Sequence, residues 1–430
     1  MEKIKIENLF IALATLFIGI SIAVMPINRV PDESNHARMA WGILYEQTDS
    51  SFDWMNSISQ NAPINKHEYK QLFTEKIDMS HEAVRLKFGL KNIVHIPQFI
   101  GMILGSMIYP SIGLMITLGR VFNGLFYIMG MYLIIKHSKY GKLPLSFISL
   151  LPIMIQQAAS LSYDVANYLA ITAFFAWISN LSVSKQITKR TIVQFIVMFF
   201  ALYATKINNL LLFLLLLTLG LRFSGILEGV NPFIEKTKAF VLKYRYLLLT
   251  IVLFLGLATV LVINQLIDVK HFTRVMINTL FSNNLNEHLN TILTIGMFGY
   301  FGNFAIQLPL WLIFADVAFL TLLFTLETEI EINKFFGVIS GVMVPFQIAA
   351  IIAGMYFAWT PVVLGTNANI SVGAQGRYFT PFLIYFVPLF LSFKNKLVLR
   401  YDRSFVKIIF TALCLFNFLV MMLLVIPYYW

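Results

Sequence analysis

The sequence predicts an all-α polytopic membrane protein, and three observations support this. Of its 430 residues, 58% are hydrophobic and only 12% are charged, whereas soluble domains carry roughly 25% charged residues. The mean hydropathy is +0.75. Apolar runs of about 20 residues, enough to cross a hydrocarbon core of roughly 30 Å, recur along the whole chain. We therefore expect one integral-membrane domain, residues 1–430, and exclude an ordinary water-soluble enzyme.

We expect about eleven transmembrane helices, within a range of about ten to thirteen. The first follows two lysines and is too long for a signal-peptide apolar region, so it is interpreted as an uncleaved anchor. The expected spans are 8–27, 112–136, 143–159, 162–182, 190–205, 207–222, 246–267, 309–327, 334–356, 378–393 and 404–427. The single cysteine, Cys414, excludes a disulfide framework and cysteine-based zinc sites.

Two further apolar stretches, 93–109 and 291–308, are not counted as spans. The first is interrupted by Pro97 and the second by three glycines. Counting either one would reverse the orientation of everything that follows it. We expect both to form amphipathic or re-entrant helices at the outer leaflet.

The charge distribution orients the chain. With the amino terminus inside, the inner segments hold 19 basic and 8 acidic residues, and the outer segments hold 13 basic and 12 acidic residues. Asp316, within a span, cancels the remaining charge, so the net charge of +11 lies on the inner face. Basic residues collect on the cytoplasmic side of membrane proteins. We therefore expect a plasma-membrane protein with a cytoplasmic amino terminus, and nucleic acid is not needed as a partner.

The sizeable polar segments then lie outside, at 28–92, 268–308 and 357–377. The first opens with the run PDESNHAR at residues 31–38. Pro31 is typical of a first helical turn, and Asp32 and Glu33 suit the positive end of that helix. Both carboxylates can share one helix face with His36. The apolar stripe predicted to lie on the bilayer surface consists of Val30, Ala37, Trp41 and Leu44.

Three interpretations of this cluster remain open. One carboxylate could be a general base for a hydroxyl nucleophile, with the imidazole orienting it. The three groups could hold a divalent cation, although they offer only two or three ligands. They could also simply cap a surface helix. The histidines and acid elsewhere in the loop (His67, His81, Glu82 and His95) match no metal motif. We assign no metal ligands, and we expect His95 to pack against the bilayer surface.

More ionisable residues are predicted near the outer face. Asp164 is expected at the outer end of a span, where helix capping is the simplest role. Lys206 lies in a tight outer turn, where a lysine can extend its ammonium group to the interface. Arg120 lies about two turns into its span and therefore requires a partner, for which Asp316 is a candidate.

The segment GAQGRYFTP, residues 373–381, brings a second group of polar residues to the outer side. It contributes Gln375, Arg377 and Tyr378, and Arg38 follows the acidic cluster. Acids beside several cations suit a phosphate-bearing ligand that faces an acid or a base. We therefore expect catalysis by Asp32 and Glu33. The expected binding residues for donor phosphate or substrate are His36, Arg38, Arg120, Asp164, Lys206, Gln375, Arg377 and Tyr378.

These motifs resemble those of the bacterial predicted membrane proteins of domain-of-unknown-function family 2142. The PDESNHAR and QGRYFTP runs are the most specific parts, with Ser-Tyr-Asp ending at Asp164 and the lysine at 206. This family in turn resembles the GT-C glycosyltransferases, which take sugars from polyprenyl-phosphate carriers on the outer membrane face. The resemblance implies that Asp32 is the catalytic carboxylate, with Glu33 as the alternate. It also implies that Arg377 and Lys206 bind the donor phosphate and that Asp164 binds the acceptor or a cation.

The expected function is transfer of a sugar from a polyprenyl-phosphate carrier to a cell-envelope glycan or lipid-linked glycan, with inversion at the anomeric carbon. No cofactor is assigned, although a divalent cation stays open. The alternatives are a transporter or flippase for a lipid-linked glycan, and a polymerase or ligase of such glycans. A transporter should carry charged residues at mid-membrane and two repeated halves. In this sequence the functional candidates lie toward the outer side, and no repeated halves are evident.

Overall fold

The computed structural model describes residues 4–45, 61–77, 84, 89–244, 246–247, 250, 268–326, 330–393 and 402–430. Within them the chain is almost entirely helical, with two pairs of two-residue strands. Five helices are long and apolar enough to cross a membrane. They are α1 (Ile6–Val24), α6 (Ile112–His137), α9 (Asp164–Ser184), α17 (Lys334–Ala358) and α20 (Arg403–Tyr429).

Shorter helices complete the bundle. The apolar ones are α5 (Ile96–Ile108), α7 (Lys142–Leu150), α8 (Pro152–Ala158), α10 (Lys189–Thr205), α16 (Leu310–Thr325) and α19 (Phe386–Ser392). Three segments are 3₁₀ helices in or beside the bundle, namely η2 (Ile207–Thr218), η4 (Gly376–Tyr378) and η5 (Thr380–Tyr385). The remaining 3₁₀ helix is η3 (Gly225–Val230). At the ends lie α2 (Glu33–Trp41), α3 (Lys66–Thr74), α4 (Leu90–Ile93), α11 (Asn231–Lys243), α13 (Val269–Phe281), α14 (Leu289–Leu293), α15 (Ile295–Phe298) and α18 (Thr360–Leu364).

The strands are two residues long and form two separate pairs. β1 (Gln186–Ile187) pairs in parallel with β2 (Arg222–Phe223), next to the start of α10. β3 (Tyr300–Phe301) pairs antiparallel with β4 (Ile306–Gln307). The second pair lies inside the apolar stretch 291–308. That stretch is therefore two short helices followed by a hairpin rather than one continuous helix.

The all-helical membrane class is confirmed. Several expected spans are nevertheless interrupted: 143–159 divides into α7 and α8 because Pro152 follows the break at Leu151. The stretch 207–222 begins as a 3₁₀ helix, whose rise of about 2.0 Å per residue makes it longer than an α-helix of the same length. The expected span 246–267 lies almost wholly outside the described residues.

The stretch 93–109 packs onto the bundle. It forms α4 and α5, and α5 runs alongside α6. A Cβ atom at Gly101 would collide with the backbone oxygen of Leu118, and one at Gly105 would lie 2.7 Å from the Cα atom of Met115. With 13 residues, α5 is about 20 Å long, which is shorter than the hydrocarbon core. The two glycines therefore allow a short helix to contact α6 directly.

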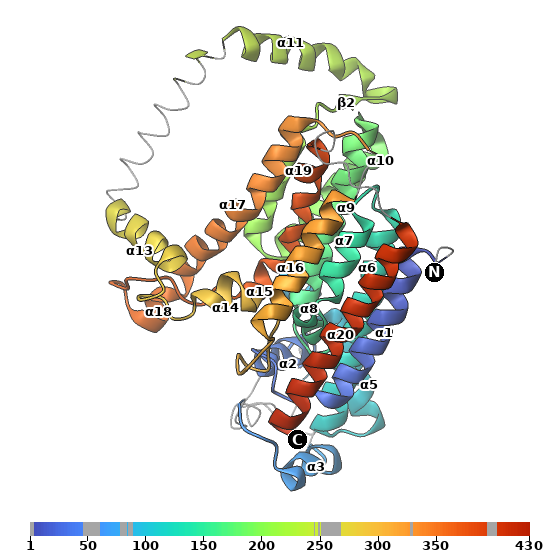
Figure 1. Cartoon of the computed structure of the whole chain (residues 1–430), viewed down its shortest axis with the longest axis vertical. Helices are drawn as coiled ribbons and strands as arrows, with labels where there is room; N and C mark the ends of the chain where they lie inside the picture. The colour runs from blue at the N-terminus through green and yellow to red at the C-terminus, as the bar shows by residue number, and fades with distance from the viewer. Residues whose placement is uncertain are drawn as a thin grey trace.

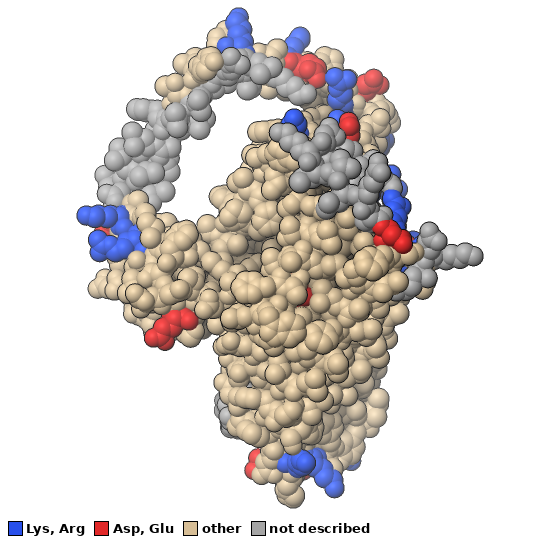
Figure 2. Space-filling view, viewed as in Figure 1, with Lys and Arg blue, Asp and Glu red and all other residues tan. Residues whose placement is uncertain are grey.

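The long helices run side by side along the long axis of the molecule (Figure 1). α2, α3 and the carboxyl terminus lie at one end and α11 lies at the other, while the amino terminus lies at the side of the bundle. Charged side chains gather near the extremities, and the surface between them is almost free of charge (Figure 2). Large apolar side chains are exposed on the helices of the bundle, among them Leu125 on α6, Phe200 on α10, Phe314 on α16 and Leu423 on α20. Such a surface fits contact with lipid, because soluble monomers rarely expose large contiguous apolar patches.

Candidate functional site

The site begins at the bend between α1 and α2. Asp32 precedes α2 and has a positive φ of 64°, in the left-handed region that is unfavourable for a side chain with a Cβ. Its side chain makes no capping hydrogen bond to α2. The interpretation of Asp32 as a helix cap is therefore wrong. The carboxylate instead extends away from the helix, with 46% of the side chain exposed.

Glu33, the next residue, has the opposite environment, since its side chain is fully buried. Its carboxylate accepts hydrogen bonds from Nε and Nη2 of Arg120 at 2.8 and 2.6 Å. It also accepts from the backbone N–H groups of Asn28 at 2.7 Å and Leu161 at 3.3 Å. The expected partner of Arg120, Asp316, bonds instead to Asn417 at 2.6 Å. We therefore interpret Glu33 as a carboxylate that stabilises the fold.

Asp164, Lys206 and Arg377 converge from three separate parts of the chain. Arg377 Nε donates to Asp164 Oδ2 at 2.9 Å, and Arg377 Nη2 donates to Asp32 Oδ2 at 3.1 Å. Lys206 Nζ lies 3.6 Å from Asp164 Oδ1. Asp164 and Arg377 are buried, and Lys206 is 14% exposed. The structure therefore brings Asp32, Asp164, Lys206 and Arg377 together in one charged cluster, while Arg120 pairs with Glu33 instead.

The Lys206 side chain does not extend into solvent at the interface, which differs from its simplest expected role, because it is only 14% exposed. Its ammonium lies 3.3 Å from the ring centroid of Tyr378, a cation–π contact that is favourable where water is excluded. Tyr163 lies on another side, 5.8 Å from the same ammonium. Burial lowers the pKa of Lys206 to about 8, against an attraction from Asp164 that raises it.

His36 lies beside this cluster, next to His95 and Tyr163. The His95 Nε2 and His36 Nδ1 atoms are 3.4 Å apart, and the His36 and Tyr163 ring centroids are 5.2 Å apart. Burial lowers the pKa of His36 to about 4, so its imidazole is neutral at neutral pH. The expectation that His95 packs against the bilayer surface is wrong, because the residue is only 1% exposed and lies inside the protein. The stripe of α2 is likewise inside the protein, because Ala37 and Trp41 are buried against α5 and α6.

The remaining expected residues lie apart from the cluster. Arg38 is half-buried and donates from Nη2 to Asn35 Oδ1 at 2.8 Å. Gln375 lines a different cavity of about 280 Å³, together with residues of α14 and of the segment before η4. Its side-chain oxygen is buried and has no hydrogen-bond partner within the part of the chain that the structure describes.

A larger cavity of about 750 Å³ opens beside the charged cluster. His95 and Tyr163 form its polar side, and Thr205 and Ile207 are the two neighbours of Lys206 in the chain. Its wall is otherwise mainly apolar. The other lining residues are Met39, Gly89, Val94, Tyr203 and Ala204.

A family model described as a predicted membrane protein (DUF2142) matches residues 15–386. The chain belongs to this family. No curated protein and no solved structure is significantly similar to it. The matched range contains Asp32, Asp164, Lys206 and Arg377, so the whole charged cluster lies within the DUF2142 region.

The charged cluster of this DUF2142 protein does not fit a divalent cation. Arg377 already contacts the carboxylates of Asp32 and Asp164, and Lys206 approaches Asp164 as well. A cation placed there would meet two positive side chains. No group of three or more His, Cys, Asp or Glu side chains suited to a metal occurs among the residues described.

Sequence reasoning missed two members of the site, Tyr163 and His95. Tyr163 lies directly before Asp164, and its ring contacts both histidines. The Ser-Tyr-Asp run could have indicated Tyr163, because the residue directly before Asp164 must lie near the same end of α9 as Asp164 does. No comparable signal existed for His95, because its position depends on how α5 packs against α2 and α6.

Proposed function

We propose that the protein is a GT-C-type glycosyltransferase. It transfers a sugar from a polyprenyl-phosphate carrier to a hydroxyl of a cell-envelope glycan or lipid-linked glycan, on the outer face of a bacterial plasma membrane. The observation that carries this proposal is the position of Asp32. It is an exposed carboxylate held 3.1 Å from Arg377 in a cluster with Asp164 and Lys206.

Asp32 suits the role of general base better than its neighbours. Glu33 and Asp164 are buried, and each is engaged by a cation. Asp32 keeps nearly half of its side chain exposed, so an acceptor hydroxyl can reach it. In the proposed reaction the Asp32 carboxylate takes the hydroxyl proton, and the acceptor oxygen bonds to the anomeric carbon. The bond between that carbon and the phosphate oxygen breaks, which inverts the anomeric centre.

Arg377 and Lys206 supply positive charge for the departing polyprenyl phosphate. Arginine and lysine are common phosphate partners, and charge stabilisation is strongest in a site that excludes water. Arg377 Nη1 is buried and has no hydrogen-bond partner among the described residues. That group is therefore free to donate to a phosphate oxygen.

The neighbouring cavity of about 750 Å³ supports a lipid-linked donor. Its wall combines apolar side chains with His95 and Tyr163 at the side of the charged cluster. A polyprenyl chain requires an apolar surface, while its phosphate requires the cations. The cavity and the cluster meet at Tyr163, which contacts both His36 and Lys206.

The proposal includes a topology of about eleven crossings with the amino terminus in the cytoplasm. Besides the five long helices, the proposed crossings are the α7 and α8 pair, α10, η2, α16 and the η5 and α19 pair. The eleventh crossing, 246–267, lies outside the described residues. In this topology the loops bearing Asp32, Lys206 and Arg377 all face outward.

The test is transfer from a purified lipid-linked sugar in proteoliposomes. Asp32→Asn should lose transfer by about 100-fold or more, because general-base catalysis contributes roughly 10²–10⁴-fold. Arg377→Ala should also lose transfer. Glu228→Gln should not, because Glu228 is an exposed carboxylate in η3. Full transfer by both Asp32→Asn and Arg377→Ala would rule out this mechanism. Comparing the surface glycan of a deletion strain with that of the wild type would identify the sugar.

A further inference from the structure

A second cavity, of about 370 Å³, lies between α3 and the segment that joins α1 to α2. Its size falls within the range of about 300–1,000 Å³ that is typical of small-molecule sites. Ile27 and Arg29 line it from the joining segment, and Asn65, Glu68, Gln71 and Glu75 line it from α3 and the two ends of that helix. This cavity shares no lining residue with the cavity of about 750 Å³ beside the charged cluster.

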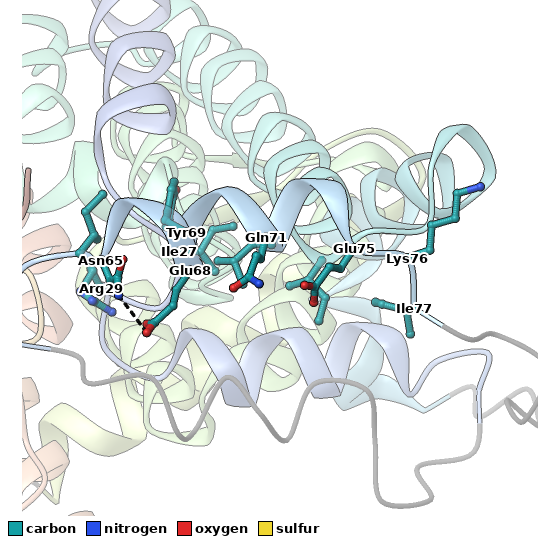
Figure 3. A pocket seen from close by; sticks show the side chains of 12 residues that line it. Ile27, Arg29, Asn65, Glu68, Tyr69, Gln71, Glu75, Lys76 and Ile77 are labelled. Atoms are coloured by element: carbon teal, nitrogen blue, oxygen red, sulfur yellow. Dashed lines mark hydrogen bonds between the residues drawn. The ribbon is translucent and has the colours of Figure 1, made fainter.

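Arg29 is the unusual residue of this cavity. Its side chain lies at the same end as Asn65 and Glu68 (Figure 3), and the residue is only 4% exposed. Its Nε donates to the backbone oxygen of Ala62 at 3.3 Å, and its guanidinium lies 5.6 Å from the Tyr429 ring centroid. Nη1 has no hydrogen-bond partner, and no carboxylate forms an ion pair with Arg29, among the residues described.

A buried guanidinium without a carboxylate is energetically costly. Burial lowers the pKa of Arg29, and only tyrosine side chains act to raise it. The other buried arginines of this end, Arg120 and Arg377, both have carboxylate partners. A ligand carrying one anionic group would supply the counter-charge that Arg29 lacks.

The rest of the cavity indicates hydroxyl groups rather than further negative charge. Asn65, Glu68, Gln71 and Glu75 recur at intervals of three and four residues and extend from the same side of α3 (Figure 3). Their amides and carboxylates can bond to hydroxyls. The carboxylates of Glu68 and Glu75 would repel a polyanion, so a single anionic group is the best match.

We propose that this cavity binds a hydroxylated ligand with one anionic group, such as an acidic saccharide or a glycerophosphate unit, with the anion on Arg29 and the hydroxyls along α3. Segment 25–33 joins this cavity to the proposed transferase site, since Ile27 and Arg29 line the cavity and Glu33 lies next to Asp32. The inference concerns binding alone and does not depend on the transfer reaction.

The test is a calorimetric titration of the full-length protein in detergent, without any sugar donor. The probes are glucuronate, glycerol 3-phosphate, glucose and inorganic phosphate. At least one of the first two should bind 10-fold or more tightly than both glucose and inorganic phosphate. The stronger of the two then identifies the anionic group as a carboxylate or a phosphate. Equal binding of glucose, equal binding of inorganic phosphate, or no binding at millimolar concentration would overturn the proposal.

Matched variants locate the site. Arg29→Gln should weaken the stronger probe by 10-fold or more, and Lys70→Ala, an exposed cation on α3 outside the cavity, should not. If Arg29→Gln does not fold, Gln71→Leu at the half-exposed rim should weaken binding severalfold. Unchanged affinity in the folded variant would overturn the assignment. Asp32→Asn should bind the probe as the wild type does, so this proposal and the transferase proposal can fail separately.

Discussion

Arg120 and Glu33 form a bidentate, buried ion pair, although they lie 87 positions apart in the chain. The same guanidinium donates to the backbone oxygens of Met25 at 2.6 Å and Pro26 at 3.0 Å. Glu33 in turn accepts from the backbone of Leu161, before α9. The pair therefore joins α6, the segment after α1 and the start of α9. This is the framework that holds Asp32 in its left-handed conformation.

Breaking this pair should destabilise the protein strongly. Removing one partner of a buried pair leaves an uncompensated charge and costs about 3–5 kcal/mol. We expect this loss for Arg120→Met, measured as the free energy of unfolding in detergent. Glu228→Gln, at an exposed position, should change it by less than about 0.5 kcal/mol. A similar small change for Arg120→Met would show that the pair does not hold the fold together.

The contact between α5 and α6 gives a second stability prediction. Gly101→Ala should destabilise by about 1–3 kcal/mol, because its Cβ would collide with the backbone of Leu118 and force the helices apart. Gly19→Ala in α1 is the matched control, since nothing lies within 4 Å of its Cβ position. It should be neutral or slightly stabilising. Thermal unfolding of both variants in the same detergent compares them, and equal melting temperatures would contradict close packing at Gly101.

Substitutions of Asp32 and Asp164 should differ in their effects on transfer activity and on the free energy of unfolding. Asp164 is buried between Arg377 and Lys206, so Asp164→Asn should cost about 3–5 kcal/mol by leaving two cations poorly compensated. Asp32 is nearly half exposed, and its buried partner Arg377 keeps the Asp164 carboxylate when Asp32 is changed. The loss should therefore be close to that of an exposed pair, about 1 kcal/mol. Asp32→Asn should therefore unfold almost as the wild type does while losing transfer. Equal destabilisation by the two variants would mean that Asp32 is a structural residue as well.

The sequence was sufficient for the class of the protein and for much of the site. Hydrophobic runs identified the all-helical membrane class, and the expected positions near the outer face marked Asp164, Lys206 and Arg377 as candidate site residues. That argument depends on composition and local position alone. In the structure, residues that it named together are in contact although they are up to 345 positions apart, as Asp32 and Arg377 are.

What the sequence could not supply was the pairing of one charge with another. Arg120 needed a carboxylate, and the choice of Asp316 was wrong because only the packing of α6 against the segment after α1 makes Glu33 the nearer acid. The roles of Asp32 and Glu33 were also indistinguishable, since adjacent residues share composition and periodicity. A left-handed bend at Asp32 sends one carboxylate inward and leaves the other exposed.

Lys206 gives the proposed reaction a specific pH dependence. Burial lowers the pKa of its ammonium to about 8, so the group is charged below pH 8 and becomes neutral as the pH rises through that value. Its attraction for the donor phosphate is present at lower pH and lost at higher pH. The charged and titratable groups near it are Asp32, Asp164, Arg377, Tyr163, Tyr378 and His36. The ordinary pKa values of aspartate, tyrosine and arginine lie near 4 or at 10 and above, and burial lowers the pKa of His36 to about 4.

The measurement is the pH profile of kcat/KM for transfer, which reports ionisations of the free enzyme. The wild type should lose kcat/KM progressively above pH 8. In Lys206→Arg the guanidinium stays charged, because its ordinary pKa exceeds 12, so the alkaline loss should disappear even if the absolute rate is lower. Lys206→Gln should be slow at every pH and should show no loss near pH 8. An identical alkaline limb in the wild type and Lys206→Arg would assign that ionisation to another group and remove Lys206 from phosphate binding.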